Sequence, residues 1–372
     1  MTGKRRIQIA QPVLGEEEWQ ALREPIETGW LTQGPKVAAF ERAFAERHGV
    51  RHAFACSSCT TALHLILAAM EIGPGDEVIV PSFTWVATAN AVLYCGARPV
   101  LVDVDRTTYN IDPAGIADKL SPRTRAIIAV HLFGLCADMD AIAAAAPGIP
   151  IVEDAACASG ASWHGQPAGS IGAAAAFSFH PRKSITTGEG GMLTTDDDKL
   201  AARVKLFKFH GVSRDAWKAY GAAATAHYDT VLAGFKYNLT DIASALGIHQ
   251  LRRLDGFIER RRQIAERYLA GLAGTPGLGL PAAPPYPHRH AWHLFTVLVD
   301  KRDDFMAKLK EQNIGSGLHF EAVHRLSLFK KGAKKLPRTE HVCARILSLP
   351  LFPDMTDQDA EDVVTAVRRL LA

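Results

Sequence analysis

Short apolar runs alternate with helical patterns through the first two-thirds of the chain, and this alternation limits the possible folds more than any other feature. The pattern predicts strands over residues 52–56, 77–81, 99–104, 126–131 and 149–153, with helices over 61–69, 84–94 and 139–146 between them. A repeated β-α-β order predicts an α/β fold, with a mostly parallel sheet covered by helices on both faces. Ligands bind beyond the carboxyl ends of such strands, which lie here at Cys56, Pro81, His131, Asp154 and Phe179.

The last third of the chain predicts a second, smaller domain. Residues 209–233 lack a clear period and predict an irregular segment, followed by two helices over 240–254 and 256–272. Residues 274–287 are rich in proline and glycine and form the best candidate linker. The remaining predicted elements are a strand over 293–299, a helix over 302–312, a strand over 317–320 and a helix over 356–371. We therefore expect a large ligand-binding domain over residues 1–250 and a small C-terminal domain over residues 251–372.

Charge and cysteine content argue against several classes of protein. The 372 residues carry a formal net charge of +3, and their short basic clusters are not interleaved with aromatic residues, so nucleic-acid binding is not expected. No apolar stretch is long enough to span a membrane and no signal peptide opens the chain, which predicts a cytoplasmic protein with no membrane partner. The six cysteines include one Cys-x-x-Cys but no second pair at zinc spacing. His288, His290 and His293 have metal-like spacing, but no carboxylate joins them in sequence, so no metal is predicted.

One lysine lies where such a sheet would present its ligand. An apolar run ends at Ser178, and His180, Lys183 and the glycine-rich turn 187–191 follow, before a further strand over 192–195. Burying a lysine readily shifts its pKa, and amines form Schiff bases with carbonyl compounds, including pyridoxal phosphate. Lys183 is therefore a candidate for covalent catalysis, with an exposed loop lysine as the alternative.

A pyridoxal phosphate site also needs a carboxylate that pairs with the pyridine nitrogen of the ring. Asp154 follows the apolar residues 149–152 at the end of a predicted buried strand. Because side chains alternate along a strand, only one of Glu153 and Asp154 can face the ring. A helix cap is the alternative role for Asp154.

The phosphate and the ring face have candidate partners at two other strand ends. Residues 57–61 follow a strand and open a helix, and free amides at a helix N-terminus favour a phosphate. Ser178 could add a hydroxyl to this phosphate site. Trp85 could stack on the ring. Ordinary helix capping at 57–61 and core packing of Trp85 are the alternatives.

Several separate motifs occur in an order that resembles a known family. They are GWLTQGPKV at 29–37, GPGDEV at 73–78, PSFTWVAT at 81–88, EDAA at 153–156, SFHPRK at 178–183 and TGEGG at 187–191. From about Gly29 to its C-terminus the chain resembles the DegT/DnrJ/EryC1/StrS family of pyridoxal-phosphate-dependent sugar-nucleotide aminotransferases. Four later segments look closest to the UDP-4-amino-4-deoxy-L-arabinose aminotransferase branch: GFKYNLTD at 234–241, HAWHLF at 290–295, GSGLHF at 315–320 and SLPLFPDM at 348–355. Perosamine-type and pseudaminic-acid-pathway aminotransferases share enough of these segments to stay open.

The resemblance implies a fold-type-I homodimer with pyridoxal 5'-phosphate as its cofactor, in which residues 1–250 would form the cofactor-binding domain. Lys183 would form the Schiff base and move a proton, Asp154 would pair with the pyridine nitrogen, and Trp85 would stack on the ring. The groups implied at the phosphate are the amides of Cys59 and Thr60, the hydroxyl of Ser178 and, from the other subunit, Asn238.

The resemblance also implies the reaction. The amino group would pass from L-glutamate to C4 of a 4-keto sugar nucleotide by a ping-pong transamination, within lipopolysaccharide biosynthesis. His319 and Thr32 would lie near the sugar, with His180 as a further candidate. A dehydratase of the same fold would carry histidine in place of Lys183, and a non-catalytic regulator that kept the fold is the rival from another class.

Two residues depart from the family pattern. Cys157 stands where the family commonly has glutamine or histidine beside the phenolic oxygen of the cofactor, and a thiol is a poorer hydrogen-bond partner. Cys59 replaces a glycine in the phosphate-binding turn. Because a side chain disfavours positive φ, we expect the backbone at Cys59 to adopt a negative φ.

Overall fold

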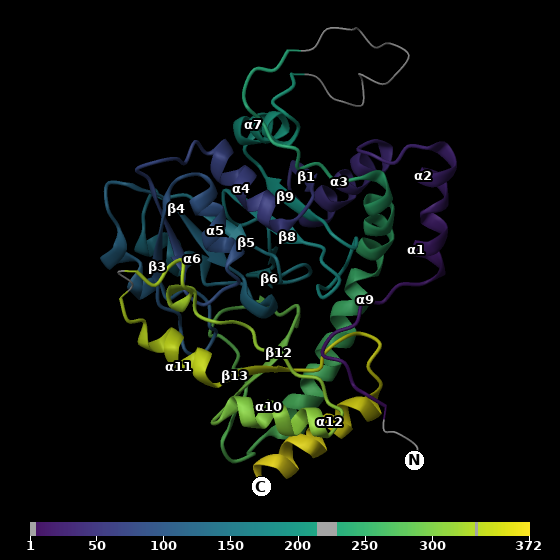
Figure 1. Ribbon diagram of the computed structural model, residues 1–372, viewed down its shortest axis with the longest axis vertical. Helices are drawn as coiled ribbons and strands as arrows, with labels where there is room; N and C mark the ends of the chain where they lie inside the picture. Colours follow the sequence, from purple (N-terminus) through teal and green to yellow (C-terminus); the bar gives the residue numbers. More distant parts are fainter. Residues whose placement is uncertain (1–4, 214–228, 332–333) are drawn as a thin grey trace.

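The computed structural model describes residues 5–213, 229–331 and 334–372, and its centre is a seven-stranded sheet (Figure 1). The strands lie in the order β1-β9-β8-β5-β4-β2-β3. Their bounds are β1 His52–Cys56, β2 Glu77–Pro81, β3 Arg98–Val102, β4 Thr124–Val130, β5 Ile151–Asp154, β8 Ala174–Ser178 and β9 Gly191–Thr195. β9 runs antiparallel to both of its neighbours, while the pairs among β2, β3, β4, β5 and β8 are parallel. The mostly parallel sheet predicted from the β-α-β pattern is confirmed.

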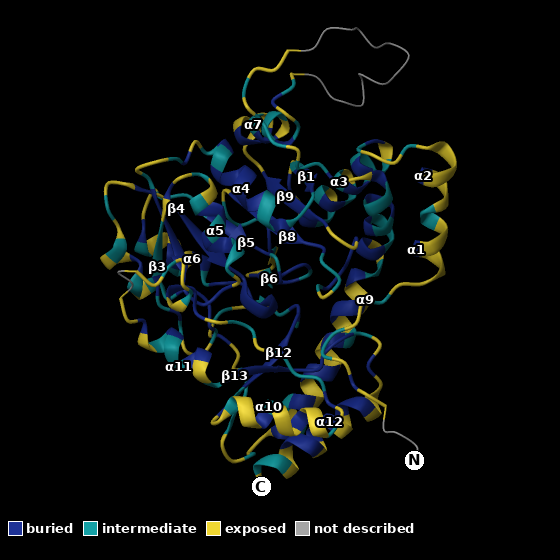
Figure 2. Ribbon diagram, viewed as in Figure 1, coloured by how far each residue is buried: buried dark blue, intermediate teal, exposed yellow. Residues whose placement is uncertain are grey.

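Helices cover both faces of this sheet, as expected. Alternate residues of β4 face opposite sides: Ile127 belongs to one buried apolar cluster and Ile128 to the other. The first cluster includes Phe40 and Phe44 from α3 (Pro35–His48), and the second includes the apolar side of α4 (Cys59–Ala69). The other helices connecting or flanking the sheet are α5 (Ala87–Tyr94), α6 (Met139–Ala145) and α7 (Asp198–Lys208). Figure 2 shows the sheet as a buried layer between them.

The C-terminal part has a sheet and an apolar cluster of its own. Strands β10 (Leu278–Gly279), β12 (Phe295–Val299) and β13 (Ile346–Leu349) form a three-stranded antiparallel sheet. Its helices are α10 (Arg302–Glu311), α11 (Pro337–Arg345) and α12 (Asp357–Leu371). The long helix α9 (Asp241–Leu272) runs from the large sheet down to this part, and its residues Tyr268 and Leu272 pack with Phe295 of β12 (Figure 1). The predicted domain boundary at residue 250 falls inside α9, and the two-domain division stays a prediction.

Short elements complete the described chain. They are α1 (Glu16–Ala21), α2 (Arg23–Thr28), β6 (Ser162–Trp163), β7 (Gln166–Pro167) and β11 (His288–Arg289), with the 3-10 turns at Pro113–Gly115, Ala117–Lys119, Leu132–Gly134 and Val323–Arg325. Among the residues that the structure describes, no helix is long and apolar enough to cross a membrane.

Two predictions about the last third were wrong. The helices expected over 240–254 and 256–272 are one continuous helix. Gly256 is exposed and lies outside the buried apolar side of this helix, so it does not interrupt the packing of the helix. A glycine inside a helix costs only about 1 kcal/mol, while the apolar side of α9 is buried along its length. The strand expected over 317–320 is absent, since Gly317 forms only an isolated bridge with Ser348. Of the irregular segment expected over 209–233, residues 214–228 lie outside the described part.

The sheet register brings the predicted ligand-binding ends of the strands together. Gly191 pairs with both Cys56 and Ser178, and Asp154 pairs with Val130 on one side and Ala176 on the other. The carboxyl ends of β1, β4, β5 and β8 therefore lie along one edge of the sheet.

Candidate active site

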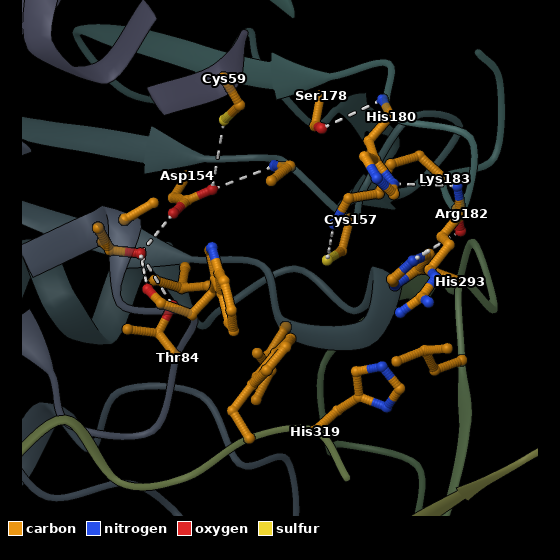
Figure 3. A pocket seen from close by; sticks show the side chains of 18 of the residues that line it. Cys59, Thr84, Asp154, Cys157, Ser178, His180, Arg182, Lys183, His293 and His319 are labelled. Atoms are coloured by element: carbon orange, nitrogen blue, oxygen red, sulfur yellow. Dashed lines mark hydrogen bonds between the residues drawn. The ribbon is translucent and has the colours of Figure 1, made fainter. Parts of the chain in front are cut away.

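A cavity of about 470 Å³ opens beyond this edge of the sheet (Figure 3). Its volume is within the range of small-molecule sites, which is about 300–1,000 Å³. Nine of the eleven site residues expected from the sequence line it: Cys59, Thr60, Trp85, Asp154, Cys157, Ser178, His180, Lys183 and His319. The other two, Thr32 and Asn238, are not among its lining residues.

Lys183 enters the cavity from a tight turn. Its backbone N–H donates to the carbonyl of His180 at 2.8 Å, which fixes the turn that follows β8. Its Nζ lies 3.2 Å from Sγ of Cys157. Burial of the amine would lower the pKa of Lys183, but the Coulombic and hydrogen-bond interactions with Cys157, and the nearby Cys59 and Asp154, raise it above its ordinary value. The amine is thus enclosed in the cavity rather than exposed on a loop.

Asp154 lines the same cavity, at the end of β5. Its Oδ2 accepts a hydrogen bond from the hydroxyl of Thr88 at 2.7 Å, and its Oδ1 accepts from the amide of Ala156 at 3.2 Å. The thiol of Cys59 also approaches Oδ1, at 3.9 Å. A turn rather than a helix follows Asp154, so the alternative role as a helix cap is excluded.

Glu153 faces away from the cavity, as the alternation of the strand requires. It is fully buried and bonded to Nε2 of His131 at 2.8 Å, and it also accepts backbone hydrogen bonds from the segment 169–172. Burial would raise the pKa of Glu153, but these hydrogen bonds and His131 hold it below its usual value. Of the two carboxylates, only Asp154 can reach a ligand in the cavity.

The start of α4 presents unbonded amides to the cavity. Ser58 caps the helix by accepting the amide of Thr61 at 3.1 Å. The preceding amides, those of Cys59 and Thr60, have no acceptor within the described part of the chain. Cys59 is the first residue of α4 and does not have a positive φ, so that expectation is confirmed. Unbonded amides at a helix N-terminus favour an anion.

A glycine makes room for this helix start. A Cβ at Gly191, the first residue of β9, would lie 2.4 Å from the carbonyl carbon of Ser58 and 2.6 Å from the amide nitrogen of Cys59. Only glycine allows the strand to run so close to the helix N-terminus. Ser178 lies beside Gly191 in the sheet, and its Oγ accepts the amide of His180 at 3.4 Å.

An aromatic wall faces the strand ends. Trp85 is 62% exposed, which excludes the alternative of a core aromatic, and its ring lies 5.8 Å from that of Phe320. Next to Phe320, Nδ1 of His319 is 2.9 Å from Oγ of Ser348. Burial, with the positive charges of Lys183 and Arg182, lowers the pKa of His319 to about 4. His319 is therefore neutral near pH 7.

Thr32 and Asn238 make backbone contacts instead. The carbonyl of Thr32 accepts the amide of Asp241 at 3.0 Å, at the start of α9. Asn238 forms an isolated β-bridge with Cys56, and its side-chain amide donates to the carbonyl of Leu239 at 3.4 Å.

Sequence reasoning missed several polar lining residues, among them Thr88, Arg182, Glu189 and His293. Arg182 directly precedes Lys183, and that position was the available signal. His293 had been noted for metal-like spacing, but its Nε2 bonds to the carbonyl of Arg182 at 3.1 Å, while His290 stacks on Trp292. No group of three or more potential metal ligands occurs among residues 5–213, 229–331 and 334–372.

The donor set of the cavity fits pyridoxal phosphate. An enclosed amine, a buried carboxylate and a pair of free helix amides correspond to its aldehyde, its pyridine nitrogen and its phosphate. The fold and this site together define a pyridoxal-phosphate-dependent enzyme of fold type I.

Comparison with known proteins assigns the family. The model of the DegT/DnrJ/EryC1/StrS aminotransferase family matches residues 12–368, so the chain belongs to this family and is a pyridoxal-phosphate-dependent sugar aminotransferase. The fold is similar to that of the aminotransferase TlmJ from Streptoalloteichus hindustanus, at 36% identity and a TM-score of 0.91 over 98% of each chain. S. venezuelae DesV is 37% identical, with a TM-score of 0.89 over 95% of this chain and 94% of its own. The pyridoxal phosphate form of the putative sugar aminotransferase Spr1654 from Streptococcus pneumoniae is 28% identical, with a TM-score of 0.91 over 99% and 100% of the two chains.

Proposed function

We propose that the enzyme transfers the amino group of L-glutamate to C4 of a 4-keto sugar nucleotide by a ping-pong reaction centred on Lys183. The observation that carries the transamination is the enclosed amine of Lys183 in one cavity with Asp154 and the free amides of α4. The glutamate donor, the C4 position and the nucleotide rest on the motifs shared with the UDP-4-amino-4-deoxy-L-arabinose aminotransferase branch. Perosamine-type and other keto-sugar aminotransferases, which differ in nucleotide or carbon position, are the alternatives.

Five residues would hold the cofactor in the cavity. The amides of Cys59 and Thr60 and the hydroxyl of Ser178 would bind its phosphate. The carboxylate of Asp154 would pair with its pyridine nitrogen, and the exposed face of Trp85 would cover its ring. Cys157 would lie beside its phenolic oxygen.

The chain supplies the positions and the proton transfer. Bound pyridoxal phosphate supplies an aldehyde that accepts the amino group and a ring that withdraws electrons. Nζ of Lys183 would remove a proton from the α-carbon of the donor as general base. It would then deliver a proton, as general acid, to the cofactor carbon that has received the amino group. The hydroxyl of Thr88 and the amide of Ala156 donate to the carboxylate of Asp154 and hold it in position for the pyridine nitrogen.

The sugar would lie against the aromatic wall. His319 is neutral near pH 7, so it can donate to or accept from a sugar hydroxyl without adding charge. His180 lines the same cavity. Thr32 and Asn238 lie outside this chain's cavity, and in a homodimer they would complete the site of the partner subunit. Cytoplasmic location and a role in lipopolysaccharide biosynthesis stay predictions.

Two measurements test this proposal. Addition of L-glutamate to the purified holoenzyme should convert the absorbance of the aldehyde form of the cofactor to that of the amine form. A non-catalytic regulator with the same fold would bind without this conversion, which would contradict the proposal. A panel of 4-keto sugar nucleotides with UDP, GDP and dTDP carriers should then reoxidise the amine form selectively, and the fastest member identifies the acceptor.

A further inference from the structure

Arg182 directly precedes Lys183 in the turn between β8 and β9, and its side chain is exposed and lines the cavity. Figure 3 shows it on the same side of the cavity as Lys183 and His293. Within the described part of the chain, no carboxylate forms an ion pair with its guanidinium. The acidic residues that line the cavity are Asp154, which is bonded to Thr88 and Ala156, and the exposed Glu189. An arginine fork therefore borders the reactive amine, and no carboxylate of residues 5–213, 229–331 or 334–372 pairs with it.

The backbone of Arg182 is held from two sides. Its N–H donates to Nδ1 of His180 at 3.2 Å, and its carbonyl accepts from Nε2 of His293 at 3.1 Å. His293 is buried, and burial together with the charges of Lys183 and Arg261 holds the pKa of His293 well below its ordinary value, so its ring is neutral and Nε2 carries the donated proton. The structure thus fixes where the side chain of Arg182 begins and leaves its charged end free for a ligand.

The charge of Arg182 reaches the substrate side of the cavity. Burial and the cations Lys183 and Arg182 together lower the pKa of His319, the histidine on the aromatic wall. The guanidinium is therefore placed to attract an anion that enters between the lysine and this wall.

The positions of the anionic groups in the proposed reaction indicate which of them Arg182 can bind. The cofactor phosphate has its own binding groups at the start of α4. The diphosphate of a sugar nucleotide is attached to C1, on the opposite side of the sugar ring from C4. The α-carboxylate of the amino donor is bonded directly to the carbon that loses its proton to Lys183, so whatever binds it must lie next to that lysine. A guanidinium matches a carboxylate with two parallel hydrogen bonds.

We propose that the guanidinium of Arg182 binds the α-carboxylate of the amino donor and so orients its Cα–H bond toward Nζ of Lys183. This inference rests on the proposed function for the identity of the donor. It implies that Arg182 serves the half-reaction with the amino acid, since a keto sugar has no carboxylate at the reacting carbon.

Binding without turnover gives the most direct test. 2-Methyl-L-glutamate has no α-proton to lose, so its affinity for the holoenzyme can be measured by calorimetry. Arg182→Gln should weaken its binding roughly ten- to hundredfold, as expected for the loss of a charge-assisted hydrogen-bond pair. Arg182→Lys should lose less, because it keeps the charge but not the planar fork. Arg368→Gln, an exposed arginine on α12, is the matched control and should bind like the wild type.

A substrate without the α-carboxylate separates binding from a structural role. In the absorbance assay, the wild type should convert with L-glutamate much faster than with its α-amide, and Arg182→Gln should lose most of this preference. The affinity of Arg182→Gln for pyridoxal phosphate, measured by absorbance titration, should be unchanged, which shows that the site is intact.

Other outcomes would overturn the inference. One such outcome is that Arg182→Gln binds 2-methyl-L-glutamate as tightly as the wild type. Another is that Arg182→Gln weakens only the binding of a free nucleoside diphosphate, measured in the same way. If L-glutamate converts the wild type but no keto sugar reoxidises it, the proposed acceptor is wrong while the role of Arg182 stands. If no amino acid converts the wild type, both are wrong.

Discussion

The amine of Lys183 lies 3.2 Å from the thiol sulfur of Cys157. Lys183 is the residue expected to carry out the reaction. Cys157, its neighbour in this contact, departs from the family pattern. A thiol is a weaker hydrogen-bond partner than the glutamine or histidine expected at this position. The proton affinity of Lys183 in the cofactor-free enzyme therefore depends on an unusual neighbour.

Replacement of Cys157 should shift the titration of Lys183. Burial lowers the pKa of this lysine, and Cys157 is the first of the groups that raise it. Cys157→Ala should therefore lower its pKa and increase the fraction of neutral amine at a given pH. In the cofactor-free protein, modification of Lys183 by an amine-selective reagent, followed by mass spectrometry, should begin at a lower pH in the variant. Cys95→Ser, outside the cavity, is the control, and identical pH profiles for Cys157→Ala and wild type would contradict the prediction.

Asp154→Asn should remove the charge that the pyridine nitrogen needs while keeping the size of the side chain. We expect a loss of turnover of roughly a hundredfold or more, as for the removal of a group that stabilises charge in the transition state. Thr88→Val removes only the donor to Asp154, so its loss should be smaller, roughly tenfold. Steady-state rates with L-glutamate and the best keto sugar measure both. A larger defect in Thr88→Val than in Asp154→Asn would contradict the assigned order.

Stability should fall at acid pH in part through His48. This residue is buried in α3 against Phe44, and burial lowers its pKa from 6.5 to about 4. Between these values the unfolded chain binds the proton and the folded protein does not, so stability is lost as pH falls from about 6.5 to about 4. The shift corresponds to roughly 3 kcal/mol. His48→Phe cannot titrate, so its urea-unfolding free energy should fall less than that of the wild type between pH 7 and pH 4, and equal losses would contradict this origin.

Mixed dimers should reveal a shared active site. Asn238 lies outside the cavity of its own chain, and the proposed dimer places it at the cofactor phosphate of the partner. Asn238→Asp would set a carboxylate against that phosphate, so this variant and Lys183→Ala should each be nearly inactive alone. Coexpression of the two chains should restore activity, because one site of each mixed dimer would contain Lys183 from one chain and Asn238 from the other. If both variants are inactive alone and mixed dimers gain nothing, the shared site is wrong.

The fold and much of the cavity could be predicted because they depend on local patterns. Short apolar runs indicated the strands, and the residues after each strand end, such as Asp154, meet at one edge of a parallel sheet. Lys183 could be predicted for the same reason. The continuity of α9 through Gly256 could not, because packing along the helix outweighs a weak local preference.

The missed contacts depend on distant parts of the chain. His293 holds the peptide of Arg182 from a position more than a hundred residues away, and Thr88 bonds to Asp154 across the gap between α5 and β5. Neither pair has a local sequence signal. The expected strand over 317–320 was wrong for a related reason, because the chain there pairs with β13 only at Gly317.

The amine of Lys183 carries the chemistry of the proposed reaction. Lys183→Ala should still bind pyridoxal phosphate through the start of α4 and Asp154, but it should lack the absorbance band of a lysine-bound cofactor. Its turnover with L-glutamate should fall at least about a thousandfold, as expected for loss of the general acid–base group. A Lys183→Ala enzyme that keeps the lysine-type absorbance band or wild-type turnover would contradict the account.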